Sequence, residues 1–559
     1  MSAREQSNTV KPPLQWPRTG VVTVNYEGEI QDAWACRYGT LTEMMKAGVA
    51  KYGDREMWYF PDFGIRWTFN AFNEVVNNVA YGLTEDYGLR KGDRVALMMT
   101  NVPEAFVSYL ALSQIGAVSV IINARLAPEE AERQFVDSGC VAAVIESNLW
   151  EGIQPVIASA PGIRQAFVTG NEACGTAKPF SDLMARSAPR EILVDVSERD
   201  VCSIIYTSGT TGKPKGTIIL HRAVVNNAMN GLCVAENVYH AHPEEWRQLV
   251  ITPFFHVTTL HTLVNFTLLG SSAVVMSTFK PKEALDLVID EEINFMVIVT
   301  AMFWILRMQP RYAELVKAGR VKYILQGGSP MPPEMFRELF KDFPDAIIGN
   351  GYGFTEGASL GWFMFISGDW DTLIQKAGSV GGTAGNSLLR IVDEDLKDVP
   401  RGQIGEILAA SPGISPGYWK LPDETAKSFV TDDNGRRWFR SGDLGYIDDD
   451  GYTFLVDRAK DMICRGGENV YCVELENLIS QHAKVLEVGV VGVADPVLGE
   501  KIKAVIFPIP GESVTEQEIK DYCRARIADF KVPDYVVFAN QLLPKNPGGK
   551  LVKKDLKAM

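Results

Sequence analysis

Residues 94–139 read RVALMMTNVPEAFVSYLALSQIGAVSVIINARLAPEEAERQFVDSG. Two short apolar runs, RVALMMT and AVSVIIN, alternate in this stretch with two longer segments that each begin near a proline. Pro103 and Pro128 suit the first turn of a helix, because their φ is already fixed and the missing N–H has no partner there. Glu129 and Glu130 place negative charge where a helix N-terminus favours it. This alternation predicts βαβ units and a largely parallel sheet.

The alternation continues towards residue 350, where TIIL, AVVM, FMVIV, YILQGG and AIIGNGYG are further strand candidates. After residue 400, the turn clusters TDDNGRRWF and IDDDGYTFLVDR predict hairpins. The acidic run at residues 448–450 also suggests calcium, but Tyr446 stands where an EF-hand loop needs its first carboxylate, so a hairpin is preferred. Beyond Asp461, mixed helix and strand patterns predict a small α+β domain. The predicted fold class is therefore α/β, with a large N-terminal domain of mostly parallel sheets and helices plus a β-rich subdomain.

The composition predicts a soluble enzyme of several domains, since 559 residues at 46% apolar and 22% charged are too many for one core. A formal charge of −14 provides no general basic field, so we expect no nucleic-acid partner. Eight cysteines without CxxC spacing, and six histidines outside any ligand pattern, favour reduced thiols, a cytoplasmic location and no zinc site. The first twenty residues lack the apolar stretch of a secretory signal. The most apolar region, residues 249–276, is broken by His256 and His261, so no transmembrane segment is expected.

Residues 206–216 read YTSGTTGKPKG and combine three glycines, four hydroxyl side chains and two lysines. Glycines let backbone N–H groups approach a polyanion, hydroxyls donate further hydrogen bonds, and lysine supplies charge. The segment differs from a Walker loop, because Lys213 is followed by Pro214 where that motif has Ser or Thr. A surface loop is the alternative, but such loops seldom combine all three features. The segment therefore predicts a phosphate-binding loop.

The same string closely resembles the signature of the adenylate-forming (AMP-binding) superfamily, which contains acyl-CoA synthetases, adenylation domains of peptide synthetases and firefly-type luciferases. The other family motifs follow in order: QGGSP at 326–330, NGYGFTEG at 350–357, RSGDLGYIDDDGY at 440–452, DRAKDMICRGGENVYCVELE at 457–476 and NPGGK at 546–550. The resemblance extends from about residue 40 to the end of the chain and favours the acyl-CoA ligase branch. It implies a reaction in which a carboxylic acid and ATP give acyl-AMP, and acyl-AMP and CoA then give acyl-CoA. It also implies Mg²⁺ as a cofactor, and a monomer or homodimer.

The resemblance assigns a role to each matching residue. Tyr352 would stack on adenine, Thr355 would bind the α-phosphate, and Glu356 would ligate Mg²⁺. Asp443 would accept the ribose hydroxyls beside Arg458. Taken alone, NGYGFTEG has a core strand followed by a turn as its less favoured alternative, whereas Asp443 alone would more often be an ordinary hairpin acid. The residues assigned to ATP or AMP are Thr207, Ser208, Gly209, Thr210, Thr211, Gly212, Lys215, Gly328, Ser329, Asn350, Gly351, Tyr352, Thr355, Asp443, Arg458 and Lys550.

Lys550 resembles the catalytic lysine of the family. A carboxylate that attacks the α-phosphate brings two anions together, so a cation that touches both is favoured in the transition state. Without the upstream motifs, this lysine would read as part of a basic, solvent-exposed tail. In the family the small domain is mobile and rotates about a hinge between the two half-reactions, and Lys460 matches the hinge position. The predicted boundary therefore separates residues 1–459 from residues 460–559.

The segment after the hinge would face coenzyme A. Gly466 and Gly467 would line the pantetheine tunnel, and Lys531 is a candidate for a CoA phosphate, although a lysine at a helix end is more often simply exposed to solvent. Cys472 stands where many relatives have proline, which could loosen this loop. An isolated cysteine entering a helix is usually a packing residue, so no catalytic role is expected for it.

The acyl pocket is expected between the adenine site and the sheet. By family position its wall would include His256, Met302, Gly328 and Gly353. The aromatic and Met residues after Gly357 suit an aryl or a medium-to-long alkyl acid, but core packing explains such density as well, and His256 would also suit an interior histidine. These segments contain no basic residue that would bind a second carboxylate.

Two other classes of function are considered. An amine or a carrier-protein thiol could capture the adenylate, although the nine residues after Lys550 leave no room for a fused carrier domain. A protein that binds ATP and acid without turnover is disfavoured by the joint presence of Glu356, Asp443, Arg458 and Lys550. A luciferase-like oxidation shares the same adenylation motifs, so the motifs alone leave that outcome open.

Overall fold

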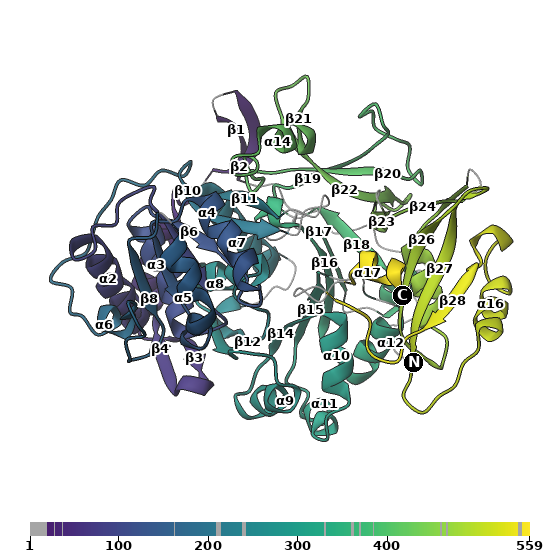
Figure 1. Cartoon of the computed structure of the whole chain (residues 1–559), viewed down its shortest axis with the longest axis horizontal. Coiled ribbons are helices and arrows are strands. Elements are labelled where there is room, and N and C mark those ends of the chain that lie inside the picture. Colours follow the sequence, from purple (N-terminus) through teal and green to yellow (C-terminus); the bar gives the residue numbers. More distant parts are fainter. Residues whose placement is uncertain are drawn as a thin grey trace, which may run out of the picture.

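The structure is a computed structural model. It describes residues 20–559 apart from residues 27, 36, 161, 208–213, 238–241, 329–330, 332, 359–362, 368–369, 384, 459–460, 466–467 and 546–550. Figure 1 shows the N-terminal part of the chain in purple and blue at one end, the middle part in teal beside it, and the C-terminal part in yellow at the other end. Among the described residues, no helix is both long and apolar enough to span a membrane.

The first sheet contains the stretch that predicts the fold class. β5 (Arg94–Met98) lies between the parallel strands β6 (Val118–Ile121) and β7 (Ala142–Ile145). β10 (Val201–Thr207) is parallel to β6 and antiparallel to β11 (Lys215–Leu220). The other edge consists of β8 (Gln165–Val168) and β9 (Lys178–Pro179). The predicted parallel arrangement is confirmed for this region.

The helices between these strands begin where the sequence predicts. α3 (Pro103–Gln114) and α4 (Pro128–Ser138) each have proline in the first turn. The Ala127 N–H donates to Glu130 Oε2 at 3.0 Å, so the acidic start of α4 binds an otherwise unpaired backbone donor. α4 ends at Gly139, whose φ of +67° is the left-handed conformation that favours glycine. Other helices of this half are α1 (Leu41–Tyr52), α2 (Phe69–Glu85), α5 (Trp150–Ser159) and α6 (Ser181–Met184).

The second sheet has a parallel part and an antiparallel part that are continuous. The parallel part consists of β3 (Glu56–Phe60), β13 (Ser272–Val275), β12 (Arg247–Val250), β14 (Phe295–Ile298), β15 (Tyr323–Gly327) and β16 (Ile347–Tyr352), with β4 (Ile65–Thr68) antiparallel at its edge. The antiparallel part continues through β17 (Phe363–Ser367), β18 (Ser379–Thr383), β23 (Thr453–Arg458), β22 (Arg437–Ile447), β20 (Gly405–Ala410) and β19 (Leu388–Val392). The β-rich region is thus an extension of the second sheet.

Helices accompany this second sheet along the sequence. They are α7 (His221–Asn237), α8 (Val257–Leu269), α9 (Pro281–Asp290), α10 (Thr300–Arg307), α11 (Tyr312–Ala318), α12 (Pro333–Asp342), α13 (Trp370–Gln375) and α14 (Pro422–Ser428). Two short strands, β1 (Val21–Tyr26) and β2 (Glu29–Trp34), form an antiparallel pair near the start of the chain.

Both predicted hairpins are present. β21 (Phe429–Thr431) pairs antiparallel with β22, and β22 pairs antiparallel with β23. The acidic turn of the second hairpin holds a lysine: Lys376 Nζ lies 2.6 Å from Asp448 Oδ2 and 2.7 Å from Asp450 Oδ2. Lys376 is buried, so these carboxylates balance a charge that would otherwise be costly in the interior. The geometry agrees with the preference for a hairpin over a calcium loop.

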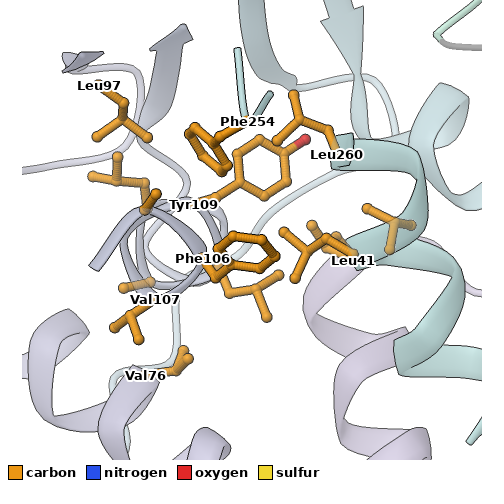
Figure 2. Close-up of a cluster of buried hydrophobic side chains, with 14 of the residues drawn as sticks. Leu41, Val76, Leu97, Phe106, Val107, Tyr109, Phe254 and Leu260 are labelled. Atoms are coloured by element: carbon orange, nitrogen blue, oxygen red, sulfur yellow. The ribbon is translucent and has the colours of Figure 1, made fainter. Parts of the chain in front are cut away.

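The largest hydrophobic cluster lies where helices α1, α3 and α8 meet the strands of both parallel regions. Figure 2 shows Tyr109 beside Phe254 and Leu260, and Phe106 directed towards Leu41. The rings of Phe106 and Phe254 have centroids 5.7 Å apart, within the range of favourable aromatic pairs. This packing fixes α8, whose N-terminus approaches the candidate site described below.

The C-terminal segment has its own sheet and core. Its strands are β25 (Glu468–Val470), β24 (Ile463–Arg465), β27 (Gly499–Pro508), β26 (Val485–Asp495) and β28 (Tyr535–Phe538), and its helices are α15 (Cys472–Ser480), α16 (Glu516–Arg524) and α17 (Lys553–Ala558). Thr515 caps α16 by accepting a hydrogen bond from the Glu518 N–H at 3.2 Å. The predicted boundary at residues 459 and 460 lies outside the described residues and stays a prediction.

Candidate active site

The predicted phosphate loop joins two strands of the first sheet. β10 and β11 run antiparallel, so Thr207 and Lys215 face each other where the loop begins and ends. Thr207 Oγ1 donates to the Lys215 carbonyl oxygen at 3.5 Å. The phosphate contacts predicted between them lie outside the described residues: Ser208, Gly209, Thr210, Thr211 and Gly212. The structure thus defines the base of the loop, and the roles of these five residues stay predictions.

Lys215 is buried and already has an anionic partner. Its Nζ lies 2.6 Å from Glu424 Oε2 on α14 and 5.0 Å from the centre of the Tyr418 ring. Hydrogen bonds from Lys215 and Lys427 lower the pKa of Glu424 to about 2. A phosphate that binds Lys215 would have to share it with Glu424, and this predicted contact remains untested.

Two predicted motifs meet at the carboxyl ends of adjacent parallel strands. The register pairs Gly327 at the end of β15 with Gly351 near the end of β16. Gly328 follows β15 with a φ of +79°, a backbone conformation that residues other than glycine rarely adopt. Ligands of open α/β sheets bind beyond such strand ends. Ser329 lies outside the described residues, so its predicted contact stays a prediction.

The Asn350 side chain has a structural role that the sequence does not predict. It is buried, and its Nδ2 donates to the Ser379 carbonyl oxygen at 2.8 Å. This bond ties β16 to β18, across the intervening strand. Asn350 thus fixes the end of β16, and its predicted contact with the nucleotide stays a prediction.

The residues predicted for adenosine form a connected group. The Tyr352 hydroxyl donates to Asp443 Oδ2 at 2.6 Å, and Arg458 Nε lies 3.2 Å from Asp443 Oδ1. Asp443 and Arg458 face each other on β22 and β23. Burial, followed by the Asp443 charge, raises the pKa of Tyr352, so this hydroxyl stays protonated and donates. The side chain of Arg458 is 47% exposed, so a ligand can reach it from solvent.

Glu356 lies beside this group, on the short 3₁₀ turn Thr355–Gly357. Its Oε1 accepts a hydrogen bond from the Tyr418 hydroxyl at 2.7 Å. Its carbonyl oxygen accepts from the Ser415 N–H at 2.7 Å, which fixes the backbone of the turn. The structure thus holds the predicted metal ligand in one orientation, next to Thr355.

The surroundings of Glu356 shift its pKa in two opposite directions. Burial raises the pKa of this carboxyl, while the Tyr418 hydrogen bond and the charges of Lys215 and Arg458 lower it in part, leaving a net rise. Lys215 belongs to the base of the phosphate loop, and Arg458 to the adenosine group. Glu356 therefore interacts with a positive charge from each of the two predicted parts of the ATP site.

An apolar cavity of about 20 Å³ lies next to the same turn. Val257, Leu260 and Val264 of α8 form one wall, Tyr109 of α3 another, and Ala358 the side nearest Glu356. Space of this size holds about one water molecule, so an acyl group requires these side chains to move.

The four residues predicted for the acyl pocket do not line this cavity. His256 is the residue just before α8, Met302 lies partly buried on α10, and Gly328 and Gly353 follow β15 and β16. His256 directly precedes the cavity residue Val257 in the chain, while Met302, Gly328 and Gly353 come from other elements. A role for the four residues in binding the acid stays a prediction.

The residues predicted for domain rotation and CoA are only partly described. Lys460, Gly466, Gly467 and Lys550 lie outside the described residues. Lys531 Nζ donates to both oxygens of Glu474 at 2.7 and 2.8 Å, so a CoA phosphate would compete with this carboxylate. Its CoA contact stays a prediction.

Cys472 begins α15 and is fully buried, which confirms its predicted packing role. Its N–H, which a proline would lack, donates to Asp457 Oδ2 at 2.5 Å. Its Sγ donates to the Asp461 carbonyl oxygen at 3.0 Å. Cysteine at this position therefore adds bonds from the start of α15 to the end of β23 and to the segment that follows β23.

The sequence model of the AMP-binding enzymes matches residues 45–419, and that of the AMP-binding enzyme C-terminal domain matches residues 474–550. The chain belongs to the AMP-binding enzyme family. It is 34% identical to the long-chain-fatty-acid–CoA ligase FadD13 of Mycobacterium tuberculosis, over 89% of this chain and 94% of that one. It is 33% identical to a feruloyl-CoA synthase of Amycolatopsis, over 88% and 94%. The structure of ATP-bound MatB from Rhodopseudomonas palustris superposes with a TM-score of 0.81 at 26% identity, covering 92% of this chain and 98% of that one.

These comparisons confirm the predicted family, the α/β fold class and the enzyme class, an AMP-forming acid–thiol ligase. The motifs that carry the resemblance thus identify an AMP-binding enzyme correctly. The roles of individual residues rest on the geometry above and on the chemistry proposed below.

Two contacts of this AMP-binding enzyme were missed by sequence reasoning. Tyr418 binds Glu356, and Glu424 binds Lys215. Both partners come from the segment PGYWKLPDET at residues 416–425, which has no recognisable motif. Ile218 N–H donates to the Gly417 carbonyl oxygen at 3.1 Å and ties this segment to β11, but long-range pairing of this kind leaves no local pattern in the sequence.

Proposed function

We propose that the chain joins a carboxylic acid to coenzyme A in two steps at this site. In the first step a carboxylate oxygen attacks the α-phosphorus of ATP, the bond to pyrophosphate breaks, and acyl-AMP forms. In the second step the CoA sulfur attacks the acyl carbon, the bond to AMP breaks, and the thiol proton passes to solvent. The observation that carries the proposal is the convergence of Tyr352, Asp443, Arg458 and Glu356 beyond the end of β16, beside the base of the glycine-rich loop.

The adenosine part of ATP would use the connected group. Asp443 would accept hydrogen bonds from the ribose hydroxyls, while Arg458 balances its charge and Tyr352 holds its other oxygen. The adenine ring would lie against Tyr352, and Thr355 would donate to the α-phosphate. Positioning by several fixed groups lowers the entropy cost of bringing acid and phosphate together.

The phosphate part would lie over the loop between Thr207 and Lys215. Its backbone N–H groups and hydroxyls would hold the β- and γ-phosphates as pyrophosphate leaves. Lys550 would contact the acid and the α-phosphate in the transition state, where negative charge gathers. Lys460 would act as the hinge about which the small domain rotates after the first step. This rotation would withdraw Lys550 and admit the CoA thiol, with Gly466, Gly467 and Lys531 on the CoA side.

Glu356 fits a role as ligand to Mg²⁺. Among the described residues, no group of three or more His, Cys, Asp and Glu side chains could hold a metal by itself. Mg²⁺ needs no such group when phosphate oxygens and waters supply most of its ligands and one carboxylate the rest. A bound Mg²⁺ would neutralise phosphate charge. The chain's own part is to hold Glu356 through Tyr418 and Ser415.

The raised pKa of Glu356 makes adenylation sensitive to acid. Because burial raises this pKa in the metal-free site, protonation competes with Mg²⁺ at a higher pH than for an ordinary glutamate, and at limiting Mg²⁺ adenylation falls as the pH is lowered. Glu356→Gln is expected to lower pyrophosphate exchange about 10- to 100-fold and to remove this acid limb. The pH profile of exchange for wild type and variant checks the prediction. Glu394→Gln is the control, since Glu394 is exposed on a turn. An unchanged acid limb in Glu356→Gln would contradict it.

The acid is proposed to be aryl or medium-to-long-chain. The cavity beside Ala358 is lined mainly by apolar side chains, and no charged side chain is among its described lining residues. The two curated relatives are named for a long-chain fatty acid and for feruloyl-CoA, which are acids of these two kinds. A monomer would suffice for this scheme, because every proposed group comes from one chain, and a homodimer would add none.

Leu260 is expected to limit the size of the acid. Leu260→Ala would enlarge the cavity next to Ala358, so kcat/KM for bulky acids should rise about tenfold relative to small ones. Leu263→Ala is the matched control, since Leu263 is buried on the same helix and does not line the cavity. Rates over a graded series of acids check this. If both variants change the dependence of rate on acid size equally, the acid does not bind in this cavity.

The acceptor is tested by offering CoA and an amine together with acid and ATP. Mass spectrometry should find acyl-CoA as the main product. A product that is chiefly amide would support the alternative, a stand-alone adenylating enzyme. Acyl-AMP that accumulates with neither acceptor consumed would point to a carrier-protein thiol.

A further inference from the structure

A lysine with a buried ammonium group lies at the start of the last helix, outside the ATP site described above. Lys553 is the first residue of α17. Its Nζ atom is buried and lies 3.2 Å from Glu476 Oε1 on α15. The two side chains are 20% and 17% exposed. A buried ammonium nitrogen is costly to remove from water unless a carboxylate nearby balances its charge, and Glu476 supplies that carboxylate here.

Glu476 links this lysine to the rest of the small sheet. Its Oε1 also accepts a hydrogen bond from the Val490 N–H on β26 at 2.8 Å. Burial raises the pKa of Glu476, and the Lys553 charge offsets part of that rise. The pair therefore binds α17, α15 and β26 together in an environment with little water.

Asp457 connects the same cluster to the adenosine group. It belongs to β23, directly before Arg458, and its carboxylate accepts from the Cys472 N–H at the start of α15. The charge of Lys553 lowers the pKa of Asp457 in part, and the charge of Asp457 contributes to the raised pKa of Lys553. The cluster of Asp457, Cys472, Glu476 and Lys553 thus spans from the strand end that carries Arg458 to the helix that follows Lys550 by three residues.

We propose that Lys553 is a positioning residue for adenylation, which holds α17 through Glu476 and Asp457 at a fixed place relative to Arg458. The proposal rests on the proposed role of Lys550, because α17 is the element to which Lys550 is tethered. Without Lys553, two carboxylates remain in the cluster without their cation, and α17 shifts. A displacement of about 1 Å at a reacting group can cost about 100-fold in rate.

The effect should be confined to one half-reaction. Lys553→Met keeps much of the side-chain volume and removes the charge. It is expected to lower kcat for acid-dependent pyrophosphate exchange about 10- to 100-fold, with KM for ATP and acid changed less than about twofold. Thioester formation from supplied acyl-adenylate and CoA should stay within about twofold. Lys553→Arg, which restores a cation, should recover most of the exchange rate.

The control is Lys554→Met, an exposed neighbour on the same helix, which should leave both half-reactions unchanged. If Lys553→Met fails to fold, as judged by circular dichroism and thermal unfolding, Glu476→Gln removes the other charge of the pair and should show the same selective loss. Equal losses in both half-reactions, or full exchange activity in a folded variant, would overturn the proposal.

A double variant separates this proposal from the role of Lys550. If Lys553 acts through Lys550, then Lys550→Ala/Lys553→Met should lose no more exchange activity than Lys550→Ala alone. Losses that multiply would overturn the positioning role. If Lys550→Ala itself leaves exchange intact, the proposed function of Lys550 fails first, and the two failures are thereby distinguished.

Discussion

Lys550→Ala is expected to slow acid-dependent pyrophosphate exchange about 1,000-fold. The reason is electrostatic: the carboxylate and the α-phosphate approach as two anions, and the lysine offsets their charge chiefly in the transition state. Thioester formation from supplied acyl-adenylate should be nearly unchanged, because that step has no such pair of anions. Rates of both half-reactions with the same preparation measure the difference.

Lys557→Ala is the control for this substitution, since Lys557 is an exposed lysine of the same C-terminal segment. It should retain both half-reactions. An equal loss of both steps in Lys550→Ala would contradict the division of labour between the steps. If Lys550→Ala retains pyrophosphate exchange, another lysine of the segment supplies the positive charge in the transition state.

Asp443→Ala is expected to lower kcat/KM for ATP about 100- to 1,000-fold. Two hydrogen bonds that ribose hydroxyls donate to a carboxylate contribute about 1.5–3 kcal/mol each, and both are lost. The substitution also leaves the buried Tyr352 hydroxyl and the Arg458 side chain without their shared carboxylate. Steady-state kinetics with varied ATP, together with thermal unfolding, measure the two consequences separately.

Asp433→Ala is a matched control, because Asp433 is an exposed acid in the other hairpin turn of the same region. Its kinetics should equal those of the wild type. If Asp443→Ala raises KM for the acid and leaves KM for ATP unchanged, Asp443 does not bind the ribose.

The fold could be predicted where the sequence carries a local pattern. Pro103 and Pro128 mark the starts of α3 and α4, and the apolar runs that precede these two helices form the neighbouring strands β5 and β6. The order of the strands carries no such pattern. β16 joins the antiparallel region through β17, so the predicted β-rich subdomain continues the second sheet, and that pairing depends on residues far apart in the chain.

The site shows the same division. Tyr352, Asp443 and Arg458 could be predicted because each lies in a motif, and the structure places them in contact. Tyr418 and Glu424 could not, because each acts on a residue of another element and lies in a segment without a motif.

The cavity proposed for the acid could not be predicted from the sequence. His256 and Met302 are predicted by family position and stay predictions, whereas the described cavity lies along Val257, Leu260 and Val264 on α8. Apolar residues of a helix next to a site resemble ordinary core residues in sequence, since both have the same spacing. Only the structure shows which face of α8 borders open space.

The central claim, that this enzyme activates a carboxylic acid as its adenylate, is tested most directly by exchange of labelled pyrophosphate into ATP across a panel of acids. We expect exchange that depends on both Mg²⁺ and acid, and that is highest with uncharged aryl or medium-to-long-chain acyl groups. No exchange with any acid in the panel, from a folded protein that binds ATP, would contradict the claim.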